Sequence, residues 1–129
     1  MKKYLLVIAL FTASHYAGSQ DLKSISINVT LKKFDDAKTD VDKFLSVEKN
    51  AAKPEGWYYK AYIYNSVARD PKKTIAESKS LNDDAFAAIK KYPQIDPKAP
   101  LTKEENNSTL FNIYYSFYNL DIKYIVDLK

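Results

Sequence analysis

The sequence predicts an all-α protein. Only two glycines and five prolines occur in 129 residues, so long stretches can form regular structure without interruption. Apolar side chains also recur at the spacing of one helix face. In the clearest case Trp57, Ala61, Tyr64 and Ala68 lie along one face of a single helix. Pro54 precedes this run and suits a first helical turn, because its missing N–H costs nothing there.

The segment 22–32 allows two interpretations. Residues 24–31 alternate polar and apolar side chains, which taken alone favours a strand. No second strand candidate occurs for it to pair with, and an isolated strand is not stable. We therefore expect a first helix over 22–32. Its inner row would contain one residue per turn, namely Leu22, Ile25, Val29 and Lys32 or Lys33.

A second helix is predicted from Phe34 onward. Asp35 and Asp36 suit a helix start because of the helix dipole, and adjacent residues on a helix do not face each other, so they are poorly placed for acid–base catalysis. A connection over 50–53 then leads to the Trp57 helix, which Asp70-Pro71 ends. The apolar face of the second helix would comprise Ala37, Val41, Phe44, Leu45 and Val47.

Polar residues dominate 71–82, and we expect an insertion between two helices there. Asp83 and Asp84 would be charges at the start of the next helix, whose inner face would hold Ala85, Ile89 and Tyr92. Three prolines predict a linker over 91–101, because a helix cannot run through them: Pro93, Pro97 and Pro100. Thr102 and Glu105 then form a capping-box pattern before an apolar run from Leu110.

These patterns resemble the tetratricopeptide repeat (TPR) family. Its first helix reads Trp-x2-Leu-Gly-x2-Tyr, and its second reads Ala-x3-Phe-x2-Ala followed by Pro. Trp57, Ala61 and Tyr64 agree in type with the first pattern, whereas Lys60 departs from it. The positions that carry the resemblance are Ala37, Trp57, Ala61, Tyr64, Ala85, Ile89 and Pro97.

The resemblance implies antiparallel helix hairpins in a short right-handed α-solenoid, with five to six helices. It divides the chain into a degenerate repeat at 20–53, a repeat with an insertion at 54–100, and an incomplete repeat at 101–129. Because the chain is still apolar where it stops, we expect a partial array rather than one with a polar cap. An exposed apolar patch would then involve Ile122, Ile125, Val126 or Leu128.

Residues 1–19 have the pattern of a secretory signal peptide. Lys2 and Lys3 precede an apolar run over 4–11 that is too short to span a membrane. Small residues at Ala17 and Ser19 favour cleavage before Gln20, with cleavage after Ala17 as the alternative. A buried N-terminal helix is the competing interpretation. We expect export to the periplasm or beyond, as an envelope-associated or secreted protein.

Composition argues against several function classes. No cysteine occurs, and the one histidine, His15, lies within the predicted signal peptide, so the usual nucleophile–base pairs and transition-metal ligands are lacking. No phosphate-binding loop or hydrolase motif occurs either. Without Lys2 and Lys3 the chain has 18 basic and 16 acidic residues, interleaved, for a net charge of +2. We therefore expect no enzyme activity, cofactor, metal or nucleic-acid partner.

Eleven tyrosines are the most informative group. The TPR resemblance implies that the first helix of each repeat lines a concave groove, and these helices would present an aromatic stripe edged by asparagine: Tyr58, Tyr62, Asn65, Phe111, Tyr115 and Tyr118. Tyrosine offers a large contact area and a hydroxyl at low entropic cost. We expect a protein–protein interaction scaffold or adaptor that binds a peptide or helix. The alternatives are a glycan- or nutrient-binding module and a structural spacer, and neighbouring elements could also cover these rings.

Overall fold

The computed structural model describes residues 17–98, 112, 115–116 and 118–119. All elements in residues 17–98 are helices, which confirms the all-α prediction for this part of the chain. They are α2 (Ala17–Thr30), α3 (Phe34–Leu45), α4 (Glu48–Ala51), α5 (Pro54–Ala68) and α6 (Ile75–Ile95). The described residues from 112 to 119 are helical as well.

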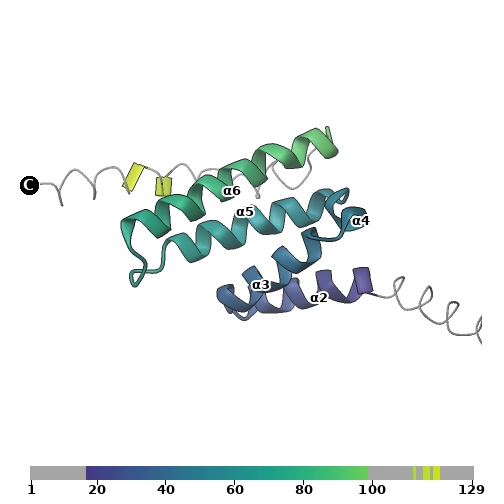
Figure 1. The fold of residues 1–129 in the computed structure, drawn as a ribbon, viewed down its shortest axis with the longest axis horizontal. Helices are drawn as coiled ribbons and strands as arrows, with labels where there is room; N and C mark the ends of the chain where they lie inside the picture. Colours follow the sequence, from purple (N-terminus) through teal and green to yellow (C-terminus); the bar gives the residue numbers. More distant parts are fainter. Residues whose placement is uncertain (1–16, 99–111, 113–114, 117, 120–129) are drawn as a thin grey trace, which may run out of the picture.

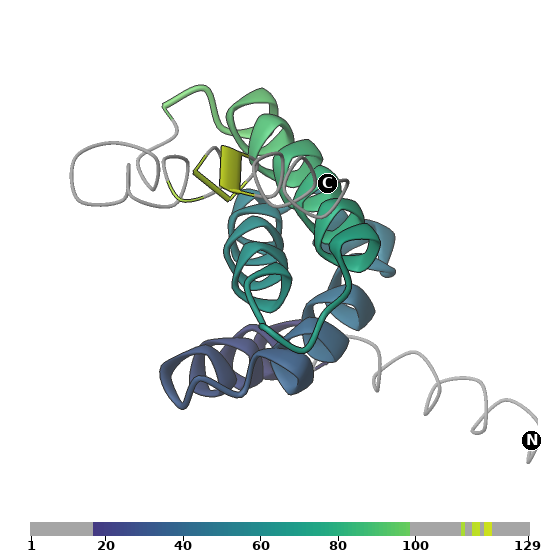
Figure 2. The ribbon, with the colours of Figure 1, turned by 90° about the vertical axis from the view of Figure 1, so that its left-hand side faces the viewer.

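Helix α5 lies at the centre of the arrangement (Figures 1 and 2). Helix α6 runs antiparallel beside it and forms the most extensive contact in the described structure. Helix α3 packs against another side of α5, and α2 packs mainly against α3. The short helix α4 joins α3 to α5. Each long helix therefore packs chiefly against the long helices that neighbour it in sequence.

The core is built from one apolar row on each long helix, largely as the sequence predicts. The predicted row on α6 is buried, as are Ala37, Val41 and Phe44 on α3 and Ala61 and Tyr64 on α5. The prediction is wrong for Val47, which lies beyond the end of α3 and is 49% exposed, and Leu45 is only half-buried. Trp57 is half-buried against the same cluster. The core comprises Ile25, Ala37, Val41, Phe44, Ala61, Ile63, Tyr64, Val67, Ala85, Ala88 and Ile89.

Burial along α2 decides between helix and strand. Ile25 is 0% exposed, whereas Ile27 and Leu31 are 48% and 59% exposed, although a strand would put all three on one face. Leu22 and Val29 pack partly against the core, as a helical row requires. The helix is longer at its start than the predicted 22–32, and it ends at Thr30.

A Schellman motif ends α2. The Lys32 N–H donates to the Val29 carbonyl at 3.0 Å, and the Lys33 N–H donates to the Asn28 carbonyl at 2.8 Å. Lys32 adopts the left-handed conformation that this motif requires, with φ of 55°. Glycine usually occupies this position because a side chain makes the conformation unfavourable. Lys32 and Lys33 are therefore exposed end residues and not part of the inner row.

The expected insertion over 71–82 is mostly helix. Helix α6 begins at Ile75, after a capping box in which the Glu77 N–H donates to Thr74 Oγ1 at 3.2 Å and the Thr74 N–H donates to Glu77 Oε2 at 2.8 Å. Asp83 and Asp84 consequently lie within α6 and not at its start. Most polar residues of this segment lie on the exposed face of the first two turns of α6.

Helix α6 also runs further than predicted, through Pro93 to Ile95. A proline so close to a helix end interrupts the backbone ladder only in the last turn, and Tyr92, which is 1% exposed, anchors that turn in the interior. The predicted linker over 91–101 is therefore wrong for residues 91–95, and α6 ends with Asp96 as its C-cap. The expected connection over 50–53 is also partly helical, because α4 occupies Glu48–Ala51.

Several expectations fall outside the described residues. They concern most of the signal peptide, Pro100, the Thr102–Glu105 capping box, Phe111 and the apolar residues from Ile122 to Leu128. Among the described helices, none combines the length and apolar character needed to cross a membrane.

Gly56 permits the close approach of α5 to the end of α3. A Cβ atom at this position would lie 2.8 Å from both Phe44 Cε1 and Leu45 Cδ2. Phe44 is 0% exposed, so its ring has little room to move. The first turn of α5 therefore sits against α3 at a separation that only a glycine allows.

Replacing Gly56 with alanine should destabilise the fold by about 1 kcal/mol. Overpacking a core costs roughly 1–3 kcal/mol, and the better helix propensity of alanine offsets up to about 1 kcal/mol of this. Urea denaturation followed by circular dichroism would measure the change, with the exposed Ala87→Ser as control. A more stable Gly56→Ala variant would contradict the close contact.

Replacing Lys32 with glycine should have the opposite effect and stabilise the protein by about 0.5–1 kcal/mol, because it removes the strain of a left-handed lysine. The adjacent Lys33→Gly is the matched control, since Lys33 has a φ of −85° and gains nothing from glycine. The same denaturation measurement applies. Equal effects of the two substitutions would argue against the motif.

Candidate functional site

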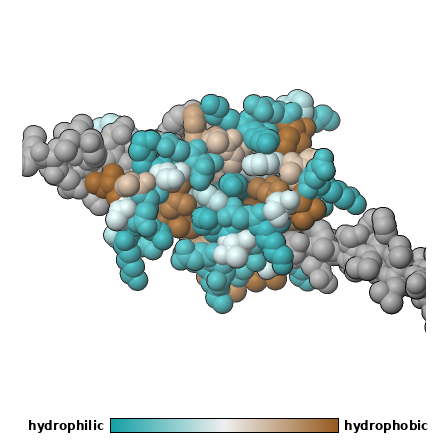
Figure 3. Space-filling model, in the orientation of Figure 1, coloured by the Kyte–Doolittle hydropathy of each residue, from teal (hydrophilic) through white to brown (hydrophobic). Residues whose placement is uncertain are grey.

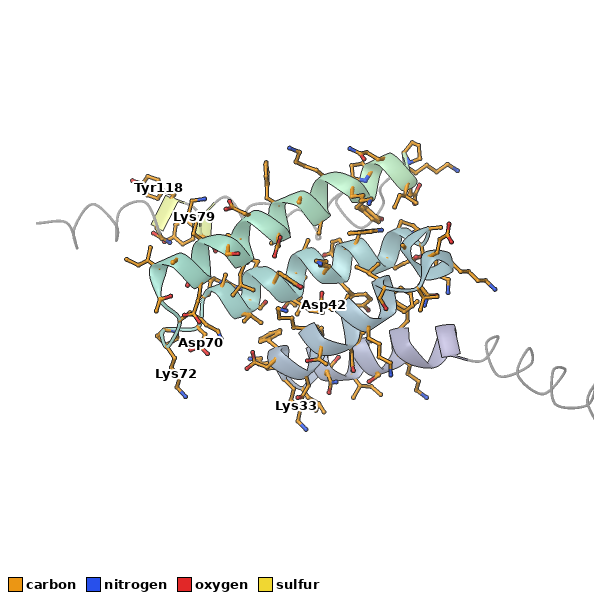
Figure 4. The ribbon with its side chains drawn as sticks, viewed as in Figure 1. Lys33, Asp42, Asp70, Lys72, Lys79 and Tyr118 are labelled. Atoms are coloured by element: carbon orange, nitrogen blue, oxygen red, sulfur yellow. The ribbon has the colours of Figure 1, made fainter. Side chains whose placement is uncertain are left out.

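A pocket of about 260 Å³ lies at the turn that joins α5 to α6. We call it the turn pocket. Figure 4 shows Asp70 and Tyr118 toward this end of the molecule. Helix α5, the turn, α6 and the described helical residues near 116 all contribute to it. Its lining residues are Ala68, Arg69, Asp70, Pro71, Lys73, Ser78, Asn82, Tyr115, Ser116 and Asn119.

Neutral polar side chains form the inner part of the turn pocket. Ser78, Asn82 and Ser116 are 4%, 0% and 5% exposed. Asn65 Nδ2, on α5, donates to Asn82 Oδ1 at 3.0 Å and to Ser116 Oγ at 2.9 Å. The Ser116 hydroxyl donates to the Asn112 carbonyl at 2.8 Å. These bonds tie α5 and α6 to Asn112 and Ser116.

One donor in this network is left over. Asn82 Nδ2 is buried and has no hydrogen-bond partner, although its Oδ1 is paired. A buried donor without an acceptor costs roughly 1–3 kcal/mol, so native proteins keep few of them. Asn82 is 0% exposed, so this amide lies beneath the wall of the turn pocket and not at its surface.

Charged residues form the rim. Arg69 is exposed, Lys73 is half-buried, and Asp70 lies between them in sequence. The Asp70 carboxylate accepts a hydrogen bond from the Lys72 N–H at 2.9 Å, which fixes the turn. Tyr115 is 53% exposed at the same pocket. The turn pocket thus combines a neutral polar interior with a rim of both charge signs and one aromatic ring.

A second hollow of about 280 Å³ lies on the other side of the same turn. Phe34, Ser66 and Lys32 contribute to it, and it shares Arg69, Asp70 and Pro71 with the turn pocket. Elsewhere the surface is mainly polar: Figure 3 shows hydrophilic side chains over most of one face, with small separate hydrophobic patches. Both hollows thus lie near the end of α5.

The structure does not bring the five predicted groove residues that it describes onto one open surface. Tyr62 packs edge-on against Phe34, with ring centroids 6.2 Å apart, and Tyr58 lies 5.8 Å from Tyr92. Both are half-buried. Tyr115 and Tyr118 are exposed at 53% and 62%. Phe111 lies outside the described residues.

Asn65 requires a correction. The sequence suggested that it edges an open groove, but it is 3% exposed and bonded to Asn82 and Ser116. Its amide links α5 to the two neighbouring segments and does not face solvent. A buried amide is paired because leaving it unpaired is costly.

Sequence reasoning did not single out Ser78, Asn82 or the rim residues. A signal was present, since Ser78, Asn82, Ala85 and Ile89 continue one helical face backward from the predicted apolar row. Two polar residues on an inward face indicate a buried polar site. The signal was missed because residues 71–82 were assigned to an insertion.

Asp42 forms a separate cluster between α3 and α5 (Figure 4). It accepts hydrogen bonds from the Tyr64 hydroxyl at 2.5 Å, Lys38 Nζ at 2.9 Å and Lys60 Nζ at 3.3 Å. Both lysine nitrogens also lie 4.6 Å from the centroid of the Tyr64 ring. The cluster thus contains one carboxylate and two ammonium groups that bind within the cluster itself, and it holds α3 and α5 together.

The pKa values of this cluster follow from its bonding. Burial acts to raise the pKa of Asp42, but the hydrogen bonds from Tyr64 and Lys38 and the charges of both lysines outweigh it and hold that pKa below its ordinary value. Burial, followed by the bond to Asp42, raises the pKa of Tyr64 far above its ordinary value. Asp42 therefore stays charged and Tyr64 stays protonated at neutral pH.

Two further findings bear on the class of site. Among the described residues, no group of three or more histidine, cysteine, aspartate or glutamate side chains is arranged to hold a metal ion. No family model, curated protein or solved structure matches this chain. The geometry of the turn pocket and its surroundings is therefore the basis for inferring the function of this protein.

Replacing Asp42 with asparagine should lower stability at pH 7 by about 1 kcal/mol and flatten its acid dependence. The pKa of Asp42 is lower in the folded state, so its contribution is present above the unfolded pKa of about 3.9 and is lost as the pH falls through the folded value. The expected loss of stability is small because solvent screens the charge of a side chain that is 36% exposed.

Urea denaturation at pH 7 and at pH 3 would check this prediction. Asp36→Asn is the control, since Asp36 is an exposed aspartate in the first turn of α3. If Asp42→Asn lost as much stability on acidification as the wild type, the proposed role of this carboxylate would be contradicted.

Proposed function

We propose that this protein is a non-enzymatic interaction module that binds a peptide or helix of a partner protein beside the turn between α5 and α6. The observation that carries this proposal is the exposure of Tyr115 and Tyr118, at 53% and 62%, in the segment that lines the turn pocket. Large aromatic side chains next to a pocket are the usual anchors of protein interfaces. Tyrosine also leaves a hydroxyl for hydrogen bonding.

The chemistry of the surface supports binding over catalysis. Amide, hydroxyl and aromatic groups surround the turn pocket, and the charged residues at its rim are of both signs. Such groups recognise the backbone and side chains of another chain by hydrogen bonds and contact area. The proposal requires no reaction, cofactor or metal.

The helical order supports a scaffold role. Helices α2, α3, α5 and α6 follow one another with short connections, and each packs mainly on the long helices beside it in sequence. We propose that this is a short TPR-like α-solenoid, for which the sequence resemblance is the support. The half-buried Tyr58 and Tyr62 shift the proposed contact surface from the start of α5 toward its end.

We also propose that the protein works in the periplasm or envelope, or outside the cell. The support is the signal-peptide pattern of residues 1–19. The partner would then be an envelope or extracellular protein. A partner isolated from the envelope or from the extracellular medium is therefore the ligand to use in binding measurements.

Replacing Tyr118 with alanine should weaken partner binding at least tenfold, because truncating an interface anchor costs about 2 kcal/mol or more. A photo-crosslinking residue at position 118 would first identify the partner in envelope extract. Titration of the purified pair would then give the affinity. Ile27→Ala is the matched control, since Ile27 is 48% exposed on the distant helix α2. Equal affinity of the wild type and Tyr118→Ala would reject this contact surface.

A glycan is the second candidate ligand. The observation that favours it is the presence of Tyr115, Asn119, Asp70 and Arg69 around one pocket, because an aromatic ring can stack on a sugar while amide and charged groups bind its hydroxyls. An oligosaccharide array set against a peptide array separates the two ligand classes. Binding to neither array would favour the remaining alternative, a structural spacer.

A further inference from the structure

The second hollow, of about 280 Å³, is lined by residues of both charge signs. Lys32 lies in the turn between α2 and α3, and Asp35 lies in the first turn of α3. Arg69 and Asp70 follow the end of α5. The chemistry of an occupant therefore depends on which of these four charges the fold itself uses.

Both carboxylates have a role in the fold. Asp70 Oδ1 accepts a hydrogen bond from the Lys72 N–H at 2.9 Å, which stabilises the turn between α5 and α6. Asp35 is placed at the start of α3, where the helix dipole stabilises a negative charge. The presence of these two anions is thus explained without a ligand.

The two cations have hydrogen-bond donors that the fold does not use. Within the part of the chain that the structure describes, the side chains of Lys32 and Arg69 form no hydrogen bond or ion pair, and the ion pairs found there involve other residues. Each cation follows the end of a helix, where the dipole favours it, but that interaction leaves its N–H groups unpaired. The groups of the second hollow that remain for a ligand are therefore cationic.

Arg69 differs from every other basic residue of the protein. Of the 20 lysine and arginine residues, it is the one arginine. It is exposed and lines both the second hollow and the turn pocket. A guanidinium group binds a carboxylate through two parallel N–H···O bonds, which a lysine cannot do. The position of Arg69 therefore favours a ligand with a carboxylate at the α5–α6 turn.

Lys32 is held in a backbone conformation that is unfavourable for lysine. Its φ is 55°, and a glycine would adopt this conformation without strain. The adjacent Lys33 already supplies a positive charge near the end of α2. Strained residues are concentrated at functional sites. Binding in the second hollow, which Lys32 lines, is thus a reason for a lysine at this position.

We propose that the second hollow binds an acidic side chain of the partner segment, a glutamate or an aspartate, whose carboxylate is held by Arg69 and Lys32. The apolar groups of Phe34, Val67 and Pro71 line the same hollow and contact the neighbouring part of the segment. Because the two hollows share Arg69, the segment continues from the second hollow to the turn pocket. This inference rests on the proposed function, because it takes the occupant to be part of a protein.

A capped peptide of sequence Glu-Glu-Leu-Glu-Glu is the probe for this site, and Gln-Gln-Leu-Gln-Gln is its uncharged control. In ¹⁵N-labelled protein the single arginine Nε–H signal, that of Arg69, should shift and saturate with the glutamate peptide. We expect a dissociation constant of millimolar order for so short a ligand. The glutamine peptide should give no saturable shift. Added salt should weaken binding, because it screens exposed charges.

Lys32→Gly is the sharpest variant, because its two expected effects have opposite signs. It removes the ammonium group and the left-handed strain, so it should weaken binding of the glutamate peptide about fivefold while it makes the fold more stable. Lys33→Gly is the matched control, since Lys33 does not line the hollow and its loss should leave the affinity nearly unchanged. Arg69→Gln, at an exposed position, should abolish the saturable shift at the backbone N–H of Val67.

Three outcomes would overturn the inference: no saturable shift with the glutamate peptide, equal binding of the two peptides, or equal affinities of Lys32→Gly and Lys33→Gly. Binding of an oligogalacturonate in place of the glutamate peptide would also overturn it, in favour of an acidic glycan. The test needs no natural partner, so it can fail while Tyr118→Ala still weakens partner binding. Conversely, binding of the glutamate peptide with no effect of Tyr118→Ala on the partner would retain this site and reject the contact surface around Tyr118.

Discussion

The central constraint of this structure is that α5 must pack closely against α3 and α6 at the same time. Small residues make this possible: Gly56 faces Phe44 and Leu45, and Ala61, Ala85 and Ala88 are almost completely buried. Close approach of the backbones lets the large side chains interdigitate around these positions, as dense packing requires. The Asp42 cluster and the Asn65 network then fix the angle and register of α5 against its neighbours.

The interior of the α5–α6 pair is apolar at its middle and polar at one end. Asn65, Asn82 and Ser78 occupy positions where a purely structural helix pair could carry alanine or leucine. Buried amides stabilise a fold only when all their groups are paired, and Asn82 Nδ2 is not. Violations of this kind are expected at or near functional sites. The polar end of the pair is therefore the part that the fold alone explains least well.

The sequence was sufficient for the helical class and most inner faces, since Ile25, Val41, Phe44 and Ile89 are buried as their spacing predicts. Other features had weaker signals. A left-handed Lys32 cannot be read from its residue type, because glycine usually marks such a site. The Thr74–Glu77 capping box was readable, but the polar residues after it suggested a loop. The spacing of Tyr58 and Tyr62 indicates a helix. It cannot show that Tyr92 covers one of these rings and Phe34 the other, because that depends on tertiary packing.

Trp57 joins three helices and is the one tryptophan of the chain. Its indole N–H donates to the Ala51 carbonyl at 2.8 Å in α4, and Lys91 Nζ of α6 lies 4.2 Å from its ring centroid. Both groups act on the excited state of the indole, one through a hydrogen bond and one through a positive charge. The tryptophan fluorescence of this protein therefore reports on the junction of α4, α5 and α6. If a partner bound at the turn pocket changed this fluorescence, its effect would extend along the α5–α6 pair to the opposite end, where Trp57 lies.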